Sequence, residues 1–199
     1  MAVETGILRG GGSGVTTLAF FLEEESARHM LEGLLPRLLP QGVQVRYIVF
    51  EGKQDLRQQL ARRLRGWQAP DTHFMVLHDQ DSSDCRELKE QLREICRQSG
   101  RPETLIRIAC RELESFYLGD LEAVEQALGL RGLAKQQKSR RFREPDELNN
   151  AAQELRKLTG GAYQKLRGSR DIGVHLRVDG GNRSISFGYL LTGIQRLVA

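Results

Sequence analysis

Apolar runs and periodically spaced apolar positions alternate along the first two thirds of the chain. Four short runs rich in β-branched and aromatic residues are typical of buried strands, and helical apolar spacing follows each of the first three. The predicted strands cover residues 18–22, 43–50, 73–77 and 104–110, and the predicted helices 26–39, 54–65 and 84–99. This alternation is typical of βαβ units. We therefore expect an α/β fold, with a mostly parallel sheet of about four strands flanked by helices.

The pattern becomes purely helical after Gly119-Asp120. Helices are predicted over 121–128, 147–158 and 184–198, separated by a glycine-broken basic stretch at 129–143. Ser26 and Asp84 are candidate N-caps. We expect three regions: a flexible Gly-rich segment (1–16), an α/β core (17–120) and a helical C-terminal extension packed on that core (121–199).

Acidic clusters stand where three of the predicted strands end. They are Glu23-Glu24-Glu25, Asp79-Gln80-Asp81 and Glu112-Leu113-Glu114. In an open α/β sheet, ligands bind outside the carboxyl ends of the strands. Gathering like charges is costly unless a cation neutralises them, and oxygen ligands without His or Cys suit Mg²⁺ or Mn²⁺. The clusters therefore predict a divalent metal site.

The members of these clusters do not carry equal weight. Glu24 and Glu25 are interpreted as favouring the positive end of a helix, whereas Glu23 lies at the strand end. Asp79 and Asp81 would share one side of an extended segment, although a turn with no metal is the alternative. For Glu112 and Glu114, the alternative to metal binding is that they lie at a solvated helix start or form ion pairs. We favour Glu114, because Phe116 and Tyr117 beside it suggest a buried setting.

Composition narrows the functional classes. The net charge of +4 permits nucleic-acid binding without establishing it. No stretch is apolar enough to cross a membrane, the N-terminus lacks the charged start, apolar stretch and cleavage site of a secretory signal, and the three cysteines are scattered, so we expect a cytoplasmic protein. The glycines at 10–12 and 14 lack the Lys of a nucleotide-binding loop. The four histidines do not cluster, which disfavours a zinc site or a Ser/His/Asp hydrolase, although His78 would adjoin the metal pocket.

Basic residues in the C-terminal third are candidates for phosphate contacts. Lys165 lies in a basic turn, 164–170, and the stretch from Arg131 to Arg143 has the composition of a mobile basic arm, with Phe142 as a candidate stacking aromatic. Plain solvation of these charges is the alternative interpretation. The candidate nucleic-acid contacts are Lys138, Arg140, Arg141, Arg167 and Arg170.

The motifs together resemble a known family. Glu23 followed by Ser26 and a helix, and then a later strand ending in Asp79-Gln80-Asp81, resembles the Toprim domain of topoisomerases, primases and overcoming-lysogenization-defect nucleases. With Arg111 to Asp120 and the tail Asn182 to Phe187, the chain is similar to a bacterial family of stand-alone Toprim-like proteins that carries a domain-of-unknown-function label. The chain departs from the common Toprim pattern at Glu24, where Gly is usual.

The resemblance implies a Toprim-like fold, a Mg²⁺ or Mn²⁺ site built from Glu23, Asp79 and Asp81, and hydrolysis of phosphodiester bonds in nucleic acid. In this interpretation Glu23 is a ligand or general base, Glu112 or Glu114 completes a second ion's shell, and Lys165 meets the phosphate. It also implies an ATP-binding-cassette-related ATPase partner and a role in antiphage defence. The alternative from another class is a non-catalytic Toprim-fold subunit that regulates the ATPase. The chain is too short for the additional domains of a topoisomerase or primase.

Overall fold

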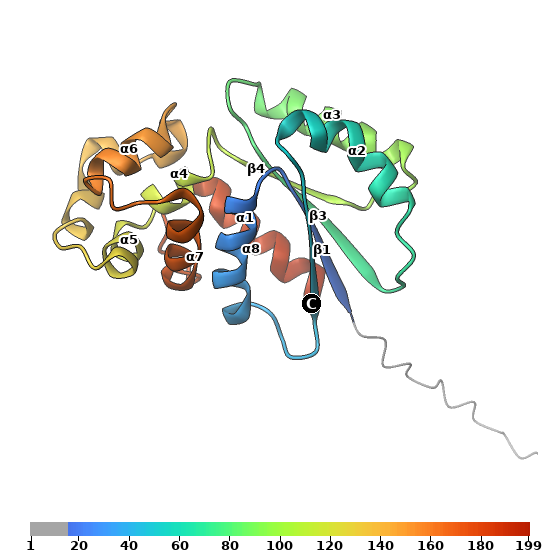
Figure 1. The fold of residues 1–199 in the computed structure, drawn as a ribbon, viewed down its shortest axis with the longest axis horizontal. Helices are drawn as coiled ribbons and strands as arrows, with labels where there is room; N and C mark the ends of the chain where they lie inside the picture. The colour runs from blue at the N-terminus through green and yellow to red at the C-terminus, as the bar shows by residue number, and fades with distance from the viewer. Residues whose placement is uncertain (1–15) are drawn as a thin grey trace, which may run out of the picture.

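The computed structural model describes residues 16–199 and contains one four-stranded sheet, all of whose pairings are parallel. Its strands are β1 (Thr17–Leu22), β2 (Gln44–Val49), β3 (Thr72–Asp79) and β4 (Leu105–Ala109), in the order β2-β1-β3-β4 (Figure 1). Leu22 lies opposite Val49 and Leu77. The carboxyl ends of the strands therefore meet at one edge of the sheet, as the predicted Toprim-like α/β fold requires.

Helices cover both faces of the sheet. One face carries α1 (Glu25–Leu34) and α8 (Ile185–Val198), and the other carries α2 (Lys53–Arg65) and α3 (Cys85–Gln98) (Figure 1). Side-chain alternation along β1 explains this division, because Phe20 packs in the core on the α1 side and Phe21 in the core on the α2 side. No helix between residues 16 and 199 is long and apolar enough to cross a membrane.

The other helices form a lobe beside α1. They are α4 (Glu114–Leu118), α5 (Leu121–Leu128), α6 (Ala151–Leu158) and α7 (Lys165–His175), with short 3₁₀ turns at Leu35–Arg37, Ala134–Lys138, Arg140–Phe142 and Pro145–Glu147 (Figure 1). Tyr117 and Ile172 of the lobe belong to the same apolar core as Leu22 of β1. The helical extension therefore shares a core with the sheet.

Close contact between α1 and α7 joins the lobe to the sheet layer. A Cβ atom on Gly173 would stand 2.4 Å from the Met30 carbonyl oxygen, and one on Gly33 would stand 2.7 Å from the Arg170 carbonyl oxygen. No real side chain tolerates such distances, so only glycine allows the two helices to come this close. This contact lies in the second half of each helix, and Lys165 at the start of α7 reaches Glu24 beside the start of α1.

The structure confirms the predicted strands to within a few residues, and it confirms Asp84 as the N-cap of α3, accepting from Arg86 N and Glu87 N. Ser26 is not a cap: α1 begins one residue earlier, and the Ser26 hydroxyl donates to Glu24 at 2.6 Å. The predicted basic turn at 164–170 is wrong, because α7 begins at Lys165.

The basic stretch at 129–143 is folded, contrary to the predicted mobile arm. The Gln137 amide is buried and donates to the carbonyls of Leu118 and Phe142 at 2.9 Å each, which ties the stretch to α4. Phe142 is itself buried and is not available to stack on a base. Of the predicted flexible segment 1–16, all but residue 16 lies outside the described residues.

Candidate functional site

Glu23 and Asp79 meet at the carboxyl edge of the sheet. Glu23 directly follows β1, and Asp79 is the last residue of β3. The Asp79 N–H donates to Glu23 Oε2 at 3.1 Å. Because β1 and β3 are neighbours in register, the two predicted site residues lie side by side, as the sequence indicated.

His78 positions the Glu23 carboxylate. Its Nδ1 lies 3.0 Å from Glu23 Oε2 and 2.5 Å from the Asp79 carbonyl oxygen. Both neighbours only accept hydrogen bonds, so Nδ1 carries the proton. The imidazole is buried, and its Nε2 has no hydrogen-bond partner among residues 16–199. His78 therefore fixes Glu23 in one orientation.

Carboxylates crowd around Asp79. Burial raises the pKa of Asp79 well above its ordinary value, and the charges of Glu23, Glu114 and Glu24 raise it further, while the Leu113 N–H opposes the shift. A carboxyl whose pKa is raised by its acidic neighbours is typical of functional sites. A bound cation would relieve this repulsion.

Glu114, the first residue of α4, is 2 % exposed. Burial raises its pKa, against the opposing effects of the Tyr163 hydroxyl and Lys165. The Tyr163 hydroxyl donates to Glu114 Oε1 at 2.9 Å and lies 3.3 Å from the Ser169 hydroxyl. The predicted buried setting of Glu114 is confirmed. Tyr163 went unnoticed in the sequence, where nothing marks it as different from any other tyrosine.

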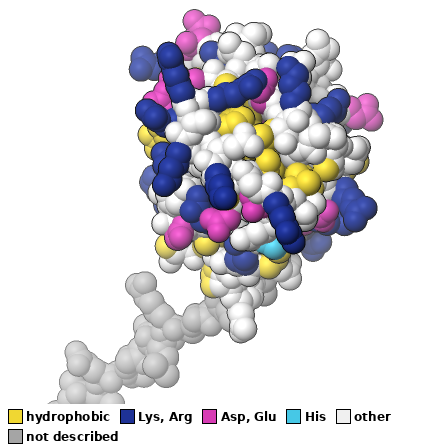
Figure 2. Space-filling view, turned by 90° about the vertical axis from the view of Figure 1, so that its left-hand side faces the viewer, with side chains coloured by type: hydrophobic (Ala, Val, Ile, Leu, Met, Phe, Trp, Pro, Cys, Tyr) yellow, Lys and Arg dark blue, Asp and Glu magenta, His cyan; other side chains and the backbone are white. Residues whose placement is uncertain are grey.

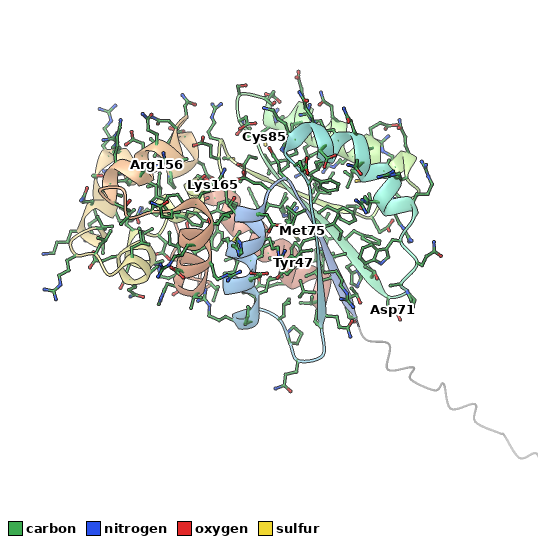
Figure 3. All side chains as sticks on the ribbon, in the orientation of Figure 1. Tyr47, Asp71, Met75, Cys85, Arg156 and Lys165 are labelled. Carbon is green, nitrogen blue, oxygen red and sulfur yellow. The ribbon has the colours of Figure 1, made fainter. Side chains whose placement is uncertain are left out.

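Two lysines pair with outer carboxylates of the site. Lys165 Nζ lies 2.7 Å from Glu24 Oε2, and Lys53 Nζ, from the first residue of α2, lies 2.8 Å from Asp81 Oδ2. Burial would lower the pKa of Lys165, but Glu24, Glu114 and Asp79 together raise it. Figure 3 shows Lys165 at the end of α7 that faces α1. Glu24 is therefore part of the site and not only a helix-start charge.

Asp81 is not related to Asp79 by strand alternation. β3 ends at Asp79, and Asp81 adopts a left-handed φ of 52° while its N–H donates to the Arg111 carbonyl at 2.8 Å. The predicted extended geometry of this pair is therefore wrong, although both residues remain at the same edge. Glu112 points elsewhere: its Oε2 accepts from Ala152 N at 2.8 Å, in the first turn of α6.

The predicted nucleic-acid residues occupy three settings. Lys138 and Arg140 are exposed, and Arg141 pairs with the buried Glu154. Arg170 binds Glu32 at 2.8 Å and His29 at 2.6 Å, which fastens α7 to α1. Arg167 is 88 % exposed beside Asp171 on α7. Figure 2 shows the lobe end of the molecule, where Lys and Arg side chains are spread over the surface with a few carboxylates between them.

The donor set of the site fits a hard divalent cation by its chemistry. The carboxylates of Glu23, Asp79 and Glu114 supply oxygen, and burial together with the charges of its acidic neighbours raises the pKa of Asp79. Their present arrangement is not a formed coordination sphere, because among residues 16–199 no three His, Cys, Asp or Glu side chains are placed to hold a metal ion. The lysine pairings of Glu24 and Asp81 are consistent with this.

Comparison with known proteins gives a family without an assigned activity. No match was found to a curated protein or to a solved structure. One family model, described as "Domain of unknown function (DUF4276)", matches residues 22–195, a range that contains every residue of the site. Since this match covers most of the chain, the protein belongs to the DUF4276 family of unknown function.

Proposed function

We propose that this protein is a divalent-metal-dependent nuclease that hydrolyses phosphodiester bonds in nucleic acid. The observation that carries the proposal is the position of Asp79 at the sheet edge, where burial and then the charges of three neighbouring glutamates raise the pKa of its carboxyl. Such a concentration of carboxylates at the carboxyl ends of parallel strands suits Mg²⁺ or Mn²⁺. The resemblance of these same residues to the Toprim pattern supports the choice of phosphodiester chemistry.

Glu23, Asp79 and Asp81 would hold the ion, with Glu114 available for a second. A bound divalent ion supplies Lewis-acid activation of water and of the phosphate. Glu112 contributes less in this scheme, because its carboxylate is engaged at the start of α6. His78 would keep Glu23 oriented through its Nδ1–H.

Lys165 and Lys53 would bind phosphate oxygens. Each now pairs with a carboxylate at the rim of the site, and each is about half exposed. A cation bound by the carboxylates would compete with these pairings and leave the ammonium groups free for the substrate. Lys165 is the candidate catalytic cation, since its pairing with Glu24 places it at the α7 end nearest to Asp79 and Glu114.

The wider setting follows from the resemblance. We propose that the nuclease acts in bacterial antiphage defence, in the cytoplasm, with an ATP-binding-cassette-related ATPase as its partner. The exposed Lys138, Arg140 and Arg167 would contact the nucleic-acid backbone.

The test is cleavage of plasmid, single-stranded DNA and RNA with Mg²⁺ or Mn²⁺, together with calorimetry of Mn²⁺ binding. Asp79→Asn and Glu23→Gln should lower cleavage by at least about 100-fold, the scale of losing a general acid or base, and should weaken Mn²⁺ binding. Glu90→Gln is the matched control, because it removes a carboxylate from an exposed position on α3 and should change neither readout. Cleavage that is equal in wild type and Asp79→Asn would exclude this site.

A non-catalytic subunit that regulates an ATPase is the second candidate. The observation that favours it is the pairing of Lys53 with Asp81 and of Lys165 with Glu24, which neutralises two site carboxylates without a metal. If the wild type neither binds Mn²⁺ nor cleaves any substrate, this second function becomes the better account.

A further inference from the structure

A groove runs along the free edge of the sheet, away from the carboxylate site. β4 is the last strand in the sheet order, and the groove lies between α3 on one face and α8 on the other. It encloses about 560 Å³. It is lined by Lys89 of α3, by Ile106, Arg107 and Ile108 of β4, and by Ile185 and Tyr189 of α8.

Backbone groups of β4 face this groove. The Ala109 carbonyl accepts from Gln80 on the β3 side, so by alternation the backbone groups of Ile106 and Ile108 point to the free edge. Side chains occupy only some of the edge: the Arg107 guanidinium donates to the Ile106 carbonyl at 3.0 Å, and the Ser186 hydroxyl accepts from Cys110 N at 3.2 Å. An edge strand with open backbone groups is a template for pairing with another strand.

Two large apolar side chains stand out from the groove wall. Ile185 is 68 % exposed and Tyr189 is 64 % exposed, one helical turn apart on α8. A closed ligand pocket would bury such side chains, whereas here they project beside the hollow. The same surface thus carries both a protrusion and a recess.

Charges along the groove are separated by sign. Glu147 lies at the end nearest Cys110, where the neighbouring Asp146 accepts from Ser184 and Ser186 at the start of α8. Lys89 and Arg107 lie further toward the middle of β4: Lys89 is one turn into α3 after Cys85, and Arg107 donates to the Tyr189 carbonyl at 2.6 Å.

Within residues 16–199, none of Lys89, Arg107 and Glu147 has an ion-pair partner. Lys89 and Arg107 are half-buried and carry uncompensated charge: burial lowers the pKa of Lys89, and nearby Arg93 and Arg107 lower it further. Glu147 is exposed at the end of the groove nearest Cys110. The groove therefore has an acidic end and a basic middle, each lacking a counter-charge among the described residues.

We infer that this groove is the interface for a second copy of the chain, with β4 pairing antiparallel to its counterpart about a two-fold axis. Such an axis brings the basic groups of each copy toward the acidic end of the other, so that Lys89 and Arg107 meet Glu147 of the partner copy. It also keeps α8 of both copies on the same face of the joined sheet, so that the partner copy covers Ile185 and Tyr189 of each copy. The two sheets would join into one eight-stranded sheet, with a carboxylate site in each half.

The test is sedimentation equilibrium over about 1–100 µM protein. We expect a species of twice the 22.5 kDa chain mass. The single variants Lys89→Glu and Glu147→Lys should each weaken self-association by at least about 10-fold, because each places like charges together twice in the two-fold assembly. Mixing the two variants should restore association, because the carboxylate introduced by Lys89→Glu then meets the ammonium introduced by Glu147→Lys, and the remaining native pair is intact.

Ile185→Asp should abolish the dimer without affecting folding, since the side chain is already exposed. Leu166→Asp is its control: Leu166 is 50 % exposed on α7, away from the groove, and its replacement should leave the dimer unchanged. A wild-type chain that stays monomeric at the highest concentration would overturn the inference. So would a dimer that persists in Ile185→Asp, or a mixture of the charge variants that associates no better than either alone.

Discussion

Asp79 shows how a single residue of the site opposes folding in the absence of a metal. Because its pKa is raised above the ordinary 3.8, the folded protein holds this proton more tightly than the unfolded chain does. Below pH 3.8 the carboxyl is protonated in both the folded and the unfolded state, so it does not oppose folding. The cost to the free energy of folding grows as the pH rises and is complete above the folded pKa. We therefore predict that Asp79→Asn raises the Tm of the metal-free protein at pH 8 by about 2–4 °C, which corresponds to ~1 kcal/mol in a domain of this size.

The pH dependence separates this electrostatic effect from a general change in packing. The Tm difference between Asp79→Asn and wild type should shrink as the pH falls toward 4, where the native carboxyl becomes neutral. Glu90→Gln should leave the Tm unchanged at both pH values, because its carboxylate is exposed on α3. An Asp79→Asn protein that melts below wild type at pH 8 would contradict the prediction. Melting curves followed by circular dichroism provide the measurement.

At the scale of elements, the contact between α1 and α7 determines where Lys165 lies. A methyl group at Gly173 would meet the Met30 carbonyl at 2.4 Å, so Gly173→Ala must push the helices apart. We predict a loss of about 1–3 kcal/mol, the usual cost of overpacking, together with a lower rate in the cleavage assay of the proposed nuclease function, because Lys165 moves away from the carboxylates. Denaturant unfolding and the cleavage assay measure the two effects.

Gly188 provides the matched control in α8. A Cβ atom there would meet nothing within 4 Å, so Gly188→Ala should gain about 0.5–1 kcal/mol from helix propensity and leave activity unchanged. If both replacements were equally harmless, the close approach of α1 and α7 would not control the site.

The comparison between sequence and structure is most informative for these same elements. The strands and the helices α2 and α3 were predictable because their apolar periodicity is local. The sequence analysis missed α7 because Gly168 and Gly173 interrupt its helical pattern. Both glycines are required by close contacts with residues outside the helix: a Cβ on Gly168 would stand 2.6 Å from the Tyr163 ring. At these two positions tertiary packing outweighs the low helix propensity of glycine.

The site divides in the same way. Glu23 and Asp79 were predictable because strand ends in register must meet. Lys53 and Tyr163 could not be predicted. Lys53 contacts Asp81, 28 residues away, and Tyr163 contacts Glu114, 49 residues away, and the local sequence pattern does not indicate contacts over such separations. A sequence pattern predicts which residues lie at the end of a helix or strand. Which side chains from other helices and strands contact those residues depends on the tertiary structure.

For the whole molecule, the distribution of charge predicts where the proposed nucleic-acid substrate would lie on its surface. The exposed Lys138 and Arg140 belong to the lobe, on the outer surface of which Lys and Arg side chains are spread (Figure 2). If both contact backbone phosphates of duplex DNA, Lys138→Ala/Arg140→Ala should reduce the slope of log K against log salt by about 1.8, at about 0.9 per phosphate contact. Fluorescence anisotropy with a labelled duplex at several salt concentrations measures this slope.

If nucleic acid were attracted by the net charge alone, removing any two positive charges would reduce the salt slope equally. A second double variant distinguishes this case from binding along the lobe. Arg63→Ala/Arg97→Ala removes the same charge from exposed positions in the last turns of α2 and α3, at the ends of these helices away from the carboxyl edge and across the sheet from α1 and the lobe. A bound duplex that lies along the lobe and reaches the carboxyl edge leaves those helices uncovered, so the salt slope should then stay at the wild-type value. Equal reductions in both double variants would mean that the +4 net charge, and not the lobe surface, attracts the nucleic acid. The path of the substrate would in that case have to be sought directly over the edge formed by Glu23, Asp79 and Lys165.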